Sequence, residues 1–253
     1  MPTPCRAYNV VLQVPVITGT LALFLNACGK PESIAELKVH NGVVVNDPSG
    51  PVRKVTLNCS GTFLGPRVFV TAGHCDGRQV LSWDDSQSLN LDHCLSGAEA
   101  TGQQGGDGIR DWLICRTDAD ASTIGVTRYA RVSMTPATPT DRVTFMGYGF
   151  ADKIRQTGSG KLRKGSGTLS RVEIHTLEIA DVPARNGQAT SPGDSGGPWL
   201  NERGELIGIH RSGSPTWNDD DFISFQSTPI LAPGFLDQLR QISPKTAPAP
   251  AQP

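Results

Sequence analysis

An all-β barrel or sandwich is the fold class that this sequence predicts, and two observations point to it. Glycine and proline are frequent, with 28 and 19 among 253 residues, whereas long runs of helix-forming residues are few. Between these turn residues lie many short segments rich in valine, isoleucine, leucine and threonine, a pattern typical of strands. The near balance of 23 basic and 24 acidic residues indicates no polyanion-binding surface, so nucleic acid is not an expected partner.

The first 27 residues have the composition of an export signal. Arg6 precedes a mostly apolar stretch, Val10 to Leu25, which is short for a membrane span and suits a signal-peptide core. Leu25-Asn26-Ala27-Cys28 resembles the lipobox of bacterial lipoprotein signals, in which the cysteine carries the lipid and becomes the first mature residue. We therefore predict a signal peptide over residues 1–27 and lipidation of Cys28, with ordinary cleavage near Ala27 as the alternative.

Three regions follow this signal. Residues 28–38 are polar and charged, and we expect a tether or propeptide there. Residues 39–242 carry the strand pattern, and residues 243–253 are rich in proline and alanine, which predicts a disordered tail. The expected strand segments are, in chain order, Val43–Val45, Val52–Leu57, Thr62–Leu64, Val68–Val70, Arg142–Met146 and Leu206–Ile209. Apolar residues recur at helical spacing from Pro233 to Ile242, so we expect a helix to end the domain.

The cysteines support export. Six cysteines leave four once Cys5 in the signal and Cys28 at the lipidation site are set aside, and an even number in an exported chain predicts two disulfides. Cys59–Cys75 would join two adjacent strands, and Cys94–Cys115 follows by exclusion. Zinc binding by His74-Cys75 with His93-Cys94 is disfavoured, because neighbours in a strand point to opposite faces. No metal and no cofactor is expected.

The most informative stretch is Thr190 to Pro198, in which Ser195 stands among glycines. Glycine permits positive φ angles and close approach of a substrate, and the amides of Gly193 and Ser195 can point the same way, as an oxyanion hole requires. The stretch also fits the nucleophile elbow of α/β-hydrolases. That class needs an acid and then a histidine after the serine. Only His210 follows Ser195, and no Asp lies between them, so the hydrolase alternative fails.

Two earlier segments offer partners for this serine. Val70 to Cys75 ends a strand with His74, and Asp111 stands directly before an apolar segment that begins at Trp112. Histidine, then aspartate, then serine is the chain order of the chymotrypsin type of catalytic triad. Asp107 is the rival acid, and Asp111 is preferred because the apolar run begins directly after it.

These motifs resemble those of the trypsin/chymotrypsin-like serine endopeptidases. The matching segments are Cys59–Thr62, Thr71–Cys75, Asp111–Ile114, Gly147–Gly149, Gly193–Pro198 and Leu206–Ile209. The resemblance implies two packed six-stranded antiparallel β-barrels with the site in the cleft between them. It also implies a monomer that hydrolyses protein or peptide substrates through an acyl-enzyme. Ser195 would be the nucleophile, His74 its general base and then acid, and Asp111 the group that orients the histidine.

The resemblance further implies activation by proteolysis. In this family the acid before the nucleophile pairs with a new N-terminus, and Asp194 occupies that place. Lys38 to Gly42 resembles the activation site, so cleavage after Lys38 would free Val39, although His40-Asn41 departs from the usual Val-Gly. A buried ion pair broken on one side costs about 3–5 kcal/mol, which would leave the precursor largely inactive.

Export and activation would then be connected. If Cys28 carries a lipid, this lipid is the expected link to a bacterial membrane, and cleavage after Lys38 would release the domain as a secreted enzyme. The chain is therefore expected to be exported, and either anchored to the cell envelope or released from it.

Three residues occupy the positions that line the specificity pocket in this family: Ala189, Thr190 and His210. Ala189 replaces the acid that selects Arg or Lys, so a cationic side chain would lack its counter-charge. Thr190 and His210 are similar to the pair that binds the substrate carboxylate in glutamyl endopeptidases, since a buried carboxylate requires charge-assisted donors. We expect cleavage after Glu. The alternatives are an apolar preference and a catalytically silent, protease-like binding domain.

Overall fold

The computed structural model describes residues 39, 41–75, 77–97, 110–152, 156–183, 187–213 and 222–243. All of them belong to one compact unit, residues 36–253. The expected signal peptide, Cys28, Lys38, His40, Asp107 and the tail from residue 244 lie outside the described residues. Within the described part, no helix is both long and apolar enough to span a membrane.

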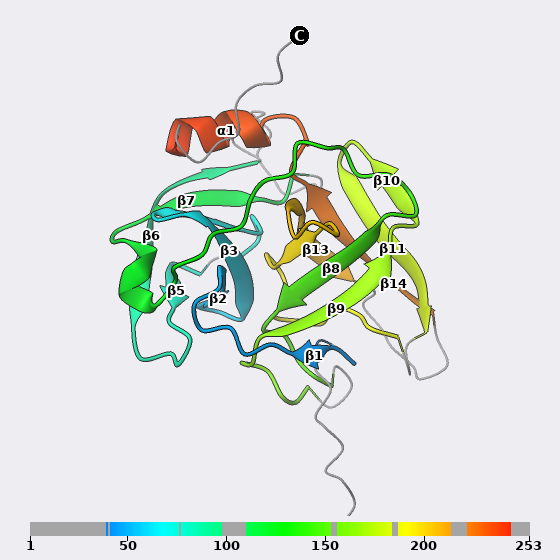
Figure 1. Ribbon diagram of the computed structural model, residues 1–253, viewed down its shortest axis with the longest axis horizontal. Coiled ribbons are helices and arrows are strands. Elements are labelled where there is room, and N and C mark those ends of the chain that lie inside the picture. The colour runs from blue at the N-terminus through cyan, green and yellow to red at the C-terminus, as the bar shows by residue number, and fades with distance from the viewer. Residues whose placement is uncertain are drawn as a thin grey trace, which may run out of the picture. The chain divides into compact units, whose positions relative to one another are not determined.

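The first half is a closed antiparallel barrel of six strands, in the order β2-β3-β4-β7-β6-β5 (Figure 1). Its strands are β2 Val52–Val55, β3 Cys59–Gly65, β4 Val68–Thr71, β5 Gln79–Leu81, β6 Ser88–Ser96 and β7 Leu113–Thr117. Phe63, Phe69 and Ile114 fill the interior and are fully buried, and the rings of Phe63 and Phe69 meet edge to face at 4.8 Å. Closure removes the free strand edges that would otherwise leave backbone groups unpaired.

The second half is an eight-stranded sheet in the order β1-β9-β8-β12-β13-β14-β11-β10. Its strands are β1 Val43–Val44, β8 Arg142–Gly147, β9 Arg163–Thr168, β10 Arg171–Glu173, β11 Thr176–Pro183, β12 Pro198–Leu200, β13 Leu206–Gly213 and β14 Phe222–Pro229. The all-β fold class is confirmed, but this half differs from a closed six-stranded barrel. Two short strands extend it: β1 pairs with the edge of β9, and β10 folds back on β11, so backbone groups at both edges find partners.

The predicted helix is confirmed as α1, Phe235–Ile242. It packs on the start of β7, where the ring of Phe235 meets Trp112 edge to face at 5.7 Å. Trp112 Nε1 donates a hydrogen bond to Gln238 Oε1 at 2.8 Å, and Gln238 Nε2 donates to the Ser96 carbonyl at 2.8 Å. The helix therefore holds the segment that carries Asp111, which directly precedes Trp112.

Both predicted disulfides, Cys59–Cys75 and Cys94–Cys115, are confirmed. Cys94 and Cys115 stand directly opposite each other in β6 and β7. Cys59–Cys75 joins the start of β3 to the residue after His74. Because these two sulfurs are bonded to each other, they offer no thiolate to a metal beside His74, although the three residues lie close together.

Candidate active site

His74 and Asp111 meet at the rim of the first barrel. The Asp111 carboxylate accepts two hydrogen bonds from His74: Oδ2 from the ring Nδ1 at 2.6 Å and Oδ1 from the backbone amide at 2.7 Å. The side chain of Asp111 is 10 % exposed, whereas that of His74 is 47 % exposed. In the neutral ring this arrangement places the proton on Nδ1 and leaves Nε2 as an acceptor that faces away from Asp111.

Ser195 is brought to the same rim by its backbone. Its carbonyl accepts a hydrogen bond from the Ser60 amide at 2.7 Å and lies 3.8 Å from Cys75 Sγ, one residue after His74. A Cβ on the next residue, Gly196, would collide with Thr71 Oγ1 and the Ser60 carbonyl, so only glycine fits there. Within the described residues the Ser195 hydroxyl makes no hydrogen bond, and such nucleophile–base pairs commonly close only when substrate binds.

The loop before Ser195 has the turn that glycine was expected to permit. Gly193 has φ +102°, and a Cβ there would lie 2.7 Å from the Gly149 Cα. The Ser191 carbonyl accepts from the Asp194 amide at 3.0 Å, which closes the turn. The amides of Gly193 and Ser195 donate no hydrogen bond to any described residue, so both remain available to a developing negative charge.

Ser60 is a site residue that sequence reasoning missed. Its hydroxyl donates to the Gly193 carbonyl at 2.7 Å and accepts from the Tyr148 amide at 3.0 Å, while its own amide binds Ser195. The signal was present, because Ser60 lies inside the matched segment that begins at Cys59. One buried serine thus ties the first barrel to both ends of the loop Gly193–Ser195.

Asp194 lies in the interior, with 1 % of its surface exposed. Its carboxylate accepts hydrogen bonds from the Gly149 amide at 2.8 Å, the Ser191 amide at 2.7 Å and the Ser191 hydroxyl at 3.2 Å. Burial raises the pKa of Asp194 to about 6, against the lowering effect of these donors. Since the ordinary value is 3.8, ionisation of this buried group costs stability, and that cost grows as the pH rises through 6.

Val39 is 1 % exposed and belongs to the apolar core of the second half. Asn41, which departs from the family pattern, is held on both sides: its Nδ2 donates to the Gly187 carbonyl at 3.0 Å, and its carbonyl accepts from Gln188 Nε2 at 3.1 Å. The segment after the expected cleavage point is therefore anchored beside the residues that directly precede Ala189 and Thr190, which we predict to line the specificity pocket.

The three residues that we predict to line the specificity pocket, Ala189, Thr190 and His210, are all buried. The Thr190 hydroxyl has no hydrogen-bond partner among the described residues and lies 3.4 Å from the position of a Cβ on Gly213 of β13. His210 stands opposite Ser227 of β14, its ring stacks on Trp199 with centroids 6.3 Å apart, and its carbonyl accepts from the Gly196 amide at 2.8 Å. Ser227, another buried hydroxyl, had no signal in the sequence.

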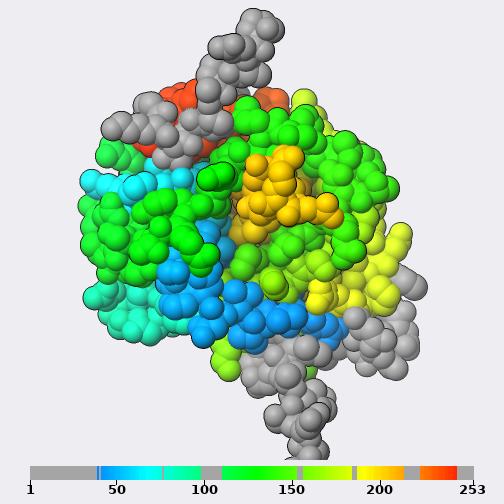
Figure 2. Space-filling view, in the orientation of Figure 1, coloured from blue at the N-terminus to red at the C-terminus, as the bar shows by residue number. Residues whose placement is uncertain are grey.

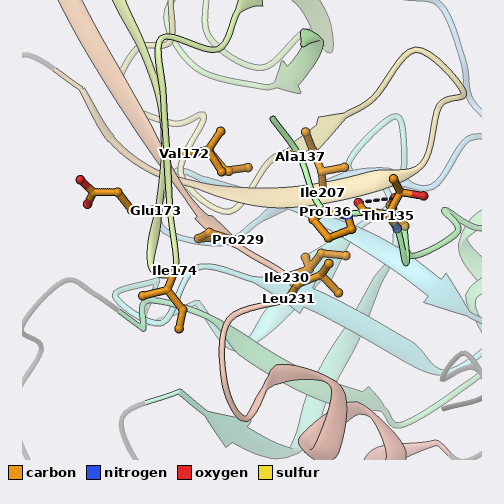
Figure 3. Close-up of a pocket in the computed structure, with 12 residues that line it drawn as sticks. Thr135, Pro136, Ala137, Val172, Glu173, Ile174, Ile207, Pro229, Ile230 and Leu231 are labelled. Atoms are coloured by element: carbon orange, nitrogen blue, oxygen red, sulfur yellow. Dashed lines mark hydrogen bonds between the residues drawn. The ribbon is translucent and has the colours of Figure 1, made fainter. Parts of the chain in front are cut away.

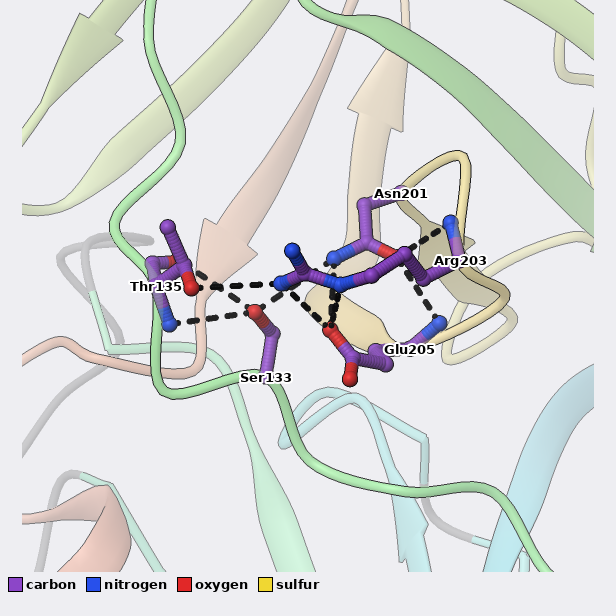
Figure 4. Close-up of polar contacts among 5 residues, drawn as sticks. All are labelled: Ser133, Thr135, Asn201, Arg203 and Glu205. Atoms are coloured by element: carbon purple, nitrogen blue, oxygen red, sulfur yellow. Dashed lines mark hydrogen bonds and ion pairs between the residues drawn. The ribbon is translucent and has the colours of Figure 1, made fainter.

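Two hollows lie elsewhere on the second half. An apolar cavity of about 290 Å³ is lined by residues that include Ala137, Ile207 and Leu231 (Figure 3). The second hollow lies beside it and is lined by residues that include Thr135, Asn201 and Arg203. There Arg203 and Asn201 both donate to Glu205 Oε2 at 2.9 Å, and Arg203 donates to Thr135 Oγ1 at 3.2 Å (Figure 4). In Figure 2 the gold turn after β12 stands exposed beside the green segment that precedes β8. Neither hollow is lined by His74, Asp111 or Ser195.

A closed six-stranded barrel against a second antiparallel sheet, with a C-terminal helix and a histidine–aspartate pair beside a glycine-rich serine loop, defines the trypsin-like serine protease fold. The chain belongs to the trypsin family: the family model described as Trypsin matches residues 39–227. Members of this class are hydrolases that act on proteins or peptides.

Solved structures agree on the fold. A glutamyl endopeptidase structure, described as "Structure of Glu endopeptidase in complex with MPD", is 19 % identical with a TM-score of 0.59, and the match covers 79 % of this chain and 97 % of that chain. Mouse neuropsin, a serine protease of the limbic system, is 17 % identical with a TM-score of 0.64, and the match covers 79 % and 98 %. No curated protein sequence matches the chain.

Proposed function

We propose that this protein is an exported serine endopeptidase in which Ser195, His74 and Asp111 form the catalytic triad. The observation that carries the proposal is the carboxylate of Asp111, which accepts hydrogen bonds from both the ring and the backbone amide of His74. The next residue, Cys75, belongs to a disulfide whose sulfur lies near the Ser195 carbonyl. Asp107, the rival acid, lies outside the described residues.

The chemistry follows from this arrangement. His74 Nε2 takes the proton of the Ser195 hydroxyl while Oγ attacks the scissile carbonyl, and the same proton then passes to the leaving amine. Asp111 holds the ring and stabilises the imidazolium. The free amides of Gly193 and Ser195 stabilise the oxyanion, and loss of one such donor costs about 3–4 kcal/mol. A water molecule, activated by His74, releases the acyl group.

Labelling with a fluorophosphonate, which reacts with an activated serine, tests this function and separates it from a silent binding domain.

We place cleavage after glutamate in the same proposal. Ala189 offers no counter-charge to Lys or Arg, whereas the buried Thr190 hydroxyl lacks an acceptor that a substrate carboxylate would supply. His210 adds a second donor from β13. The structurally similar protein described as a Glu endopeptidase is consistent with this preference, although at 19 % identity it shows the fold alone. An apolar preference remains the alternative.

Thr190→Val is expected to lower kcat/KM for a Glu substrate by about 10- to 100-fold relative to its Leu counterpart, because one charge-assisted hydrogen bond is lost at nearly constant volume. The measurement compares peptides that differ only in the residue before the scissile bond. Thr228→Val is the matched control, since Thr228 is also a buried hydroxyl without a partner among the described residues but stands opposite Ile209. Equal losses on both peptides would rule out the acidic pocket.

Activation by cleavage after Lys38 is the third part of the proposal, supported by the buried place of Val39 and by the interior carboxylate of Asp194. The active form is expected to begin at Val39. Lys38→Gln is expected to keep activity about 150- to 5,000-fold lower, because a buried ion pair that lacks one partner costs about 3–5 kcal/mol. N-terminal sequencing and labelling of both forms measure this. A fully active chain that begins at Cys28 would contradict it.

Residues 28–38 would then be both propeptide and tether. With a lipid on Cys28, cleavage would release the domain from the cell envelope at the same moment that it becomes active. The two disulfides fit an exported protein.

A further inference from the structure

Arg163 is a fully buried arginine in β9 that the proposed mechanism does not use. Its Nη1 donates a hydrogen bond to the Lys161 carbonyl at 2.6 Å. A guanidinium in the interior is costly unless negative charge lies nearby, because burial removes its hydration. Its position in the sheet brings it to the face on which the Asp194 carboxylate lies.

The strand register places Arg163 beside Asp194. Arg163 stands directly opposite Gly147 of β8, and opposite residues of an antiparallel pair project from the same face with their Cβ atoms about 5 Å apart. A Cβ on Gly147 would collide with Asp194 Oδ1. The Arg163 side chain therefore leaves β9 on the face that the Asp194 carboxylate covers. The Arg163 charge also lowers the pKa of Asp194, against the larger effect of burial.

Val39 lies on this same face. Gly165 follows Arg163 by two positions in β9, so both face the same side of the sheet. A Cβ on Gly165 would lie 3.2 Å from Val39 Cγ1. The residue that cleavage after Lys38 would turn into a free N-terminus is thus packed over the strand that carries Arg163.

Few other groups act on Asp194. Among the described residues that face it, Ser191 and Gly149 donate hydrogen bonds, and Gly147 of β8 packs against the carboxylate. Tyr148 is titratable, but burial raises its pKa and it stays neutral. Among the described residues, Arg163 supplies a charge that lowers the pKa of Asp194.

We propose that Arg163 is a positioning residue whose buried charge keeps Asp194 ionised in the uncut chain and so holds the loop Gly193–Ser195 partly in its oxyanion-binding shape. The amine of Val39, once released, then adds a second positive charge to an ion that is already in place. The catalytic consequence rests on the proposed function, whereas the charge pairing itself does not.

Carbon-13 NMR of the aspartate carboxyls tests the pairing without any need for activity. The uncut chain with Ser195→Ala is titrated, and Asp194→Asn identifies the Asp194 signal. Arg163→Met is expected to raise the Asp194 midpoint by about one pH unit or more, because an opposite charge is lost, whereas Arg163→Lys keeps it near the original value. Arg171→Met, on the exposed strand β10, is the control and leaves it unchanged. An Asp194 midpoint unaffected by Arg163→Met would overturn the proposal.

Stability supplies a second measurement. If the charges form a pair, Arg163→Met/Asp194→Asn is expected to melt at a higher temperature than Arg163→Met alone, since no unpaired carboxylate remains buried. A double variant that melts at or below the temperature of Arg163→Met alone would contradict the pairing.

The consequence for the site is measured by fluorophosphonate labelling at pH 6. A midpoint that moves from 6 to 7 lowers the ionised fraction of Asp194 from about one-half to about one-tenth, so Arg163→Met is expected to slow labelling of the Lys38→Gln chain about fivefold. The cleaved enzyme should slow less. Equal slowing of the uncut chain and the cleaved enzyme would contradict the proposed role of Arg163 in the uncut chain. Absence of labelling in every form, with the NMR shift intact, would instead count against the proposed function alone.

Discussion

Ser195→Ala is expected to lower kcat for peptide hydrolysis by about 10⁶-fold and to abolish fluorophosphonate labelling, because no other group in the triad can form the acyl intermediate. His74→Ala should cost about as much, since the hydroxyl without its base is a poor nucleophile. The double variant should lose little more than either single one, because the two groups act as a unit. Purified variants assayed on one peptide substrate give all three numbers.

Ser122→Ala is the matched control for this prediction. Ser122 is an exposed serine that lies in the short 3-10 turn Ala121–Ile124 and not in the glycine-rich loop. Its replacement should leave kcat and labelling unchanged. Labelling that persists in Ser195→Ala would show that a different serine reacts, and the proposed triad would have to be abandoned.

Asp111→Asn is expected to lower kcat by about 10⁴-fold with little change in KM. The carboxylate now accepts from both the His74 amide and Nδ1, and an asparagine has only one acceptor oxygen for these two donors. Its NH₂ group would favour the ring tautomer in which Nδ1 carries no proton, and Nε2 could then no longer accept the proton of Ser195. Steady-state kinetics across pH 6–9 measure the loss.

Asp118→Asn is its control, because Asp118 is an exposed aspartate whose carboxylate, among the described residues, accepts hydrogen bonds from the Asn90 amide and side chain. It should alter neither kcat nor KM. An unchanged kcat in Asp111→Asn would point instead to Asp107, the other acid that precedes β7.

Local patterns predicted the elements well where short-range chemistry decides them. The valine-rich runs of Val52 and Val68 became β2 and β4, and the helical spacing from Phe235 became α1. The count of strands in the second half was not readable in the same way. The local pattern predicted a strand at Val43–Val45, but the pairing of this strand with the edge of β9 is a long-range event that no local pattern records.

The candidate site divides along the same line. The chain order of its three groups and its glycine loop could be read directly from the sequence. Positive φ at Gly193 and tight packing at Gly196 both require glycine, and glycine is visible in the sequence. Ser60 lies in a segment that matches the family, but its hydrogen bond to the Gly193 carbonyl could not be read from the sequence. Arg163, which directly precedes Lys164, looks like an ordinary surface residue until β8 and β9 are paired.

The sequence by itself determined the β class, the cysteine pairs, the terminal helix and the order of the three chemical groups, because turns, periodicity and spacing are properties of neighbouring residues. The tertiary structure alone decided that the Ser60 hydroxyl binds the loop that carries Ser195, and that Arg163 and Asp194 lie on one face of the second sheet. The physical reason is strand register: it brings residues that are far apart in the chain to one face of a sheet, and only there do their charges and hydrogen bonds act on each other.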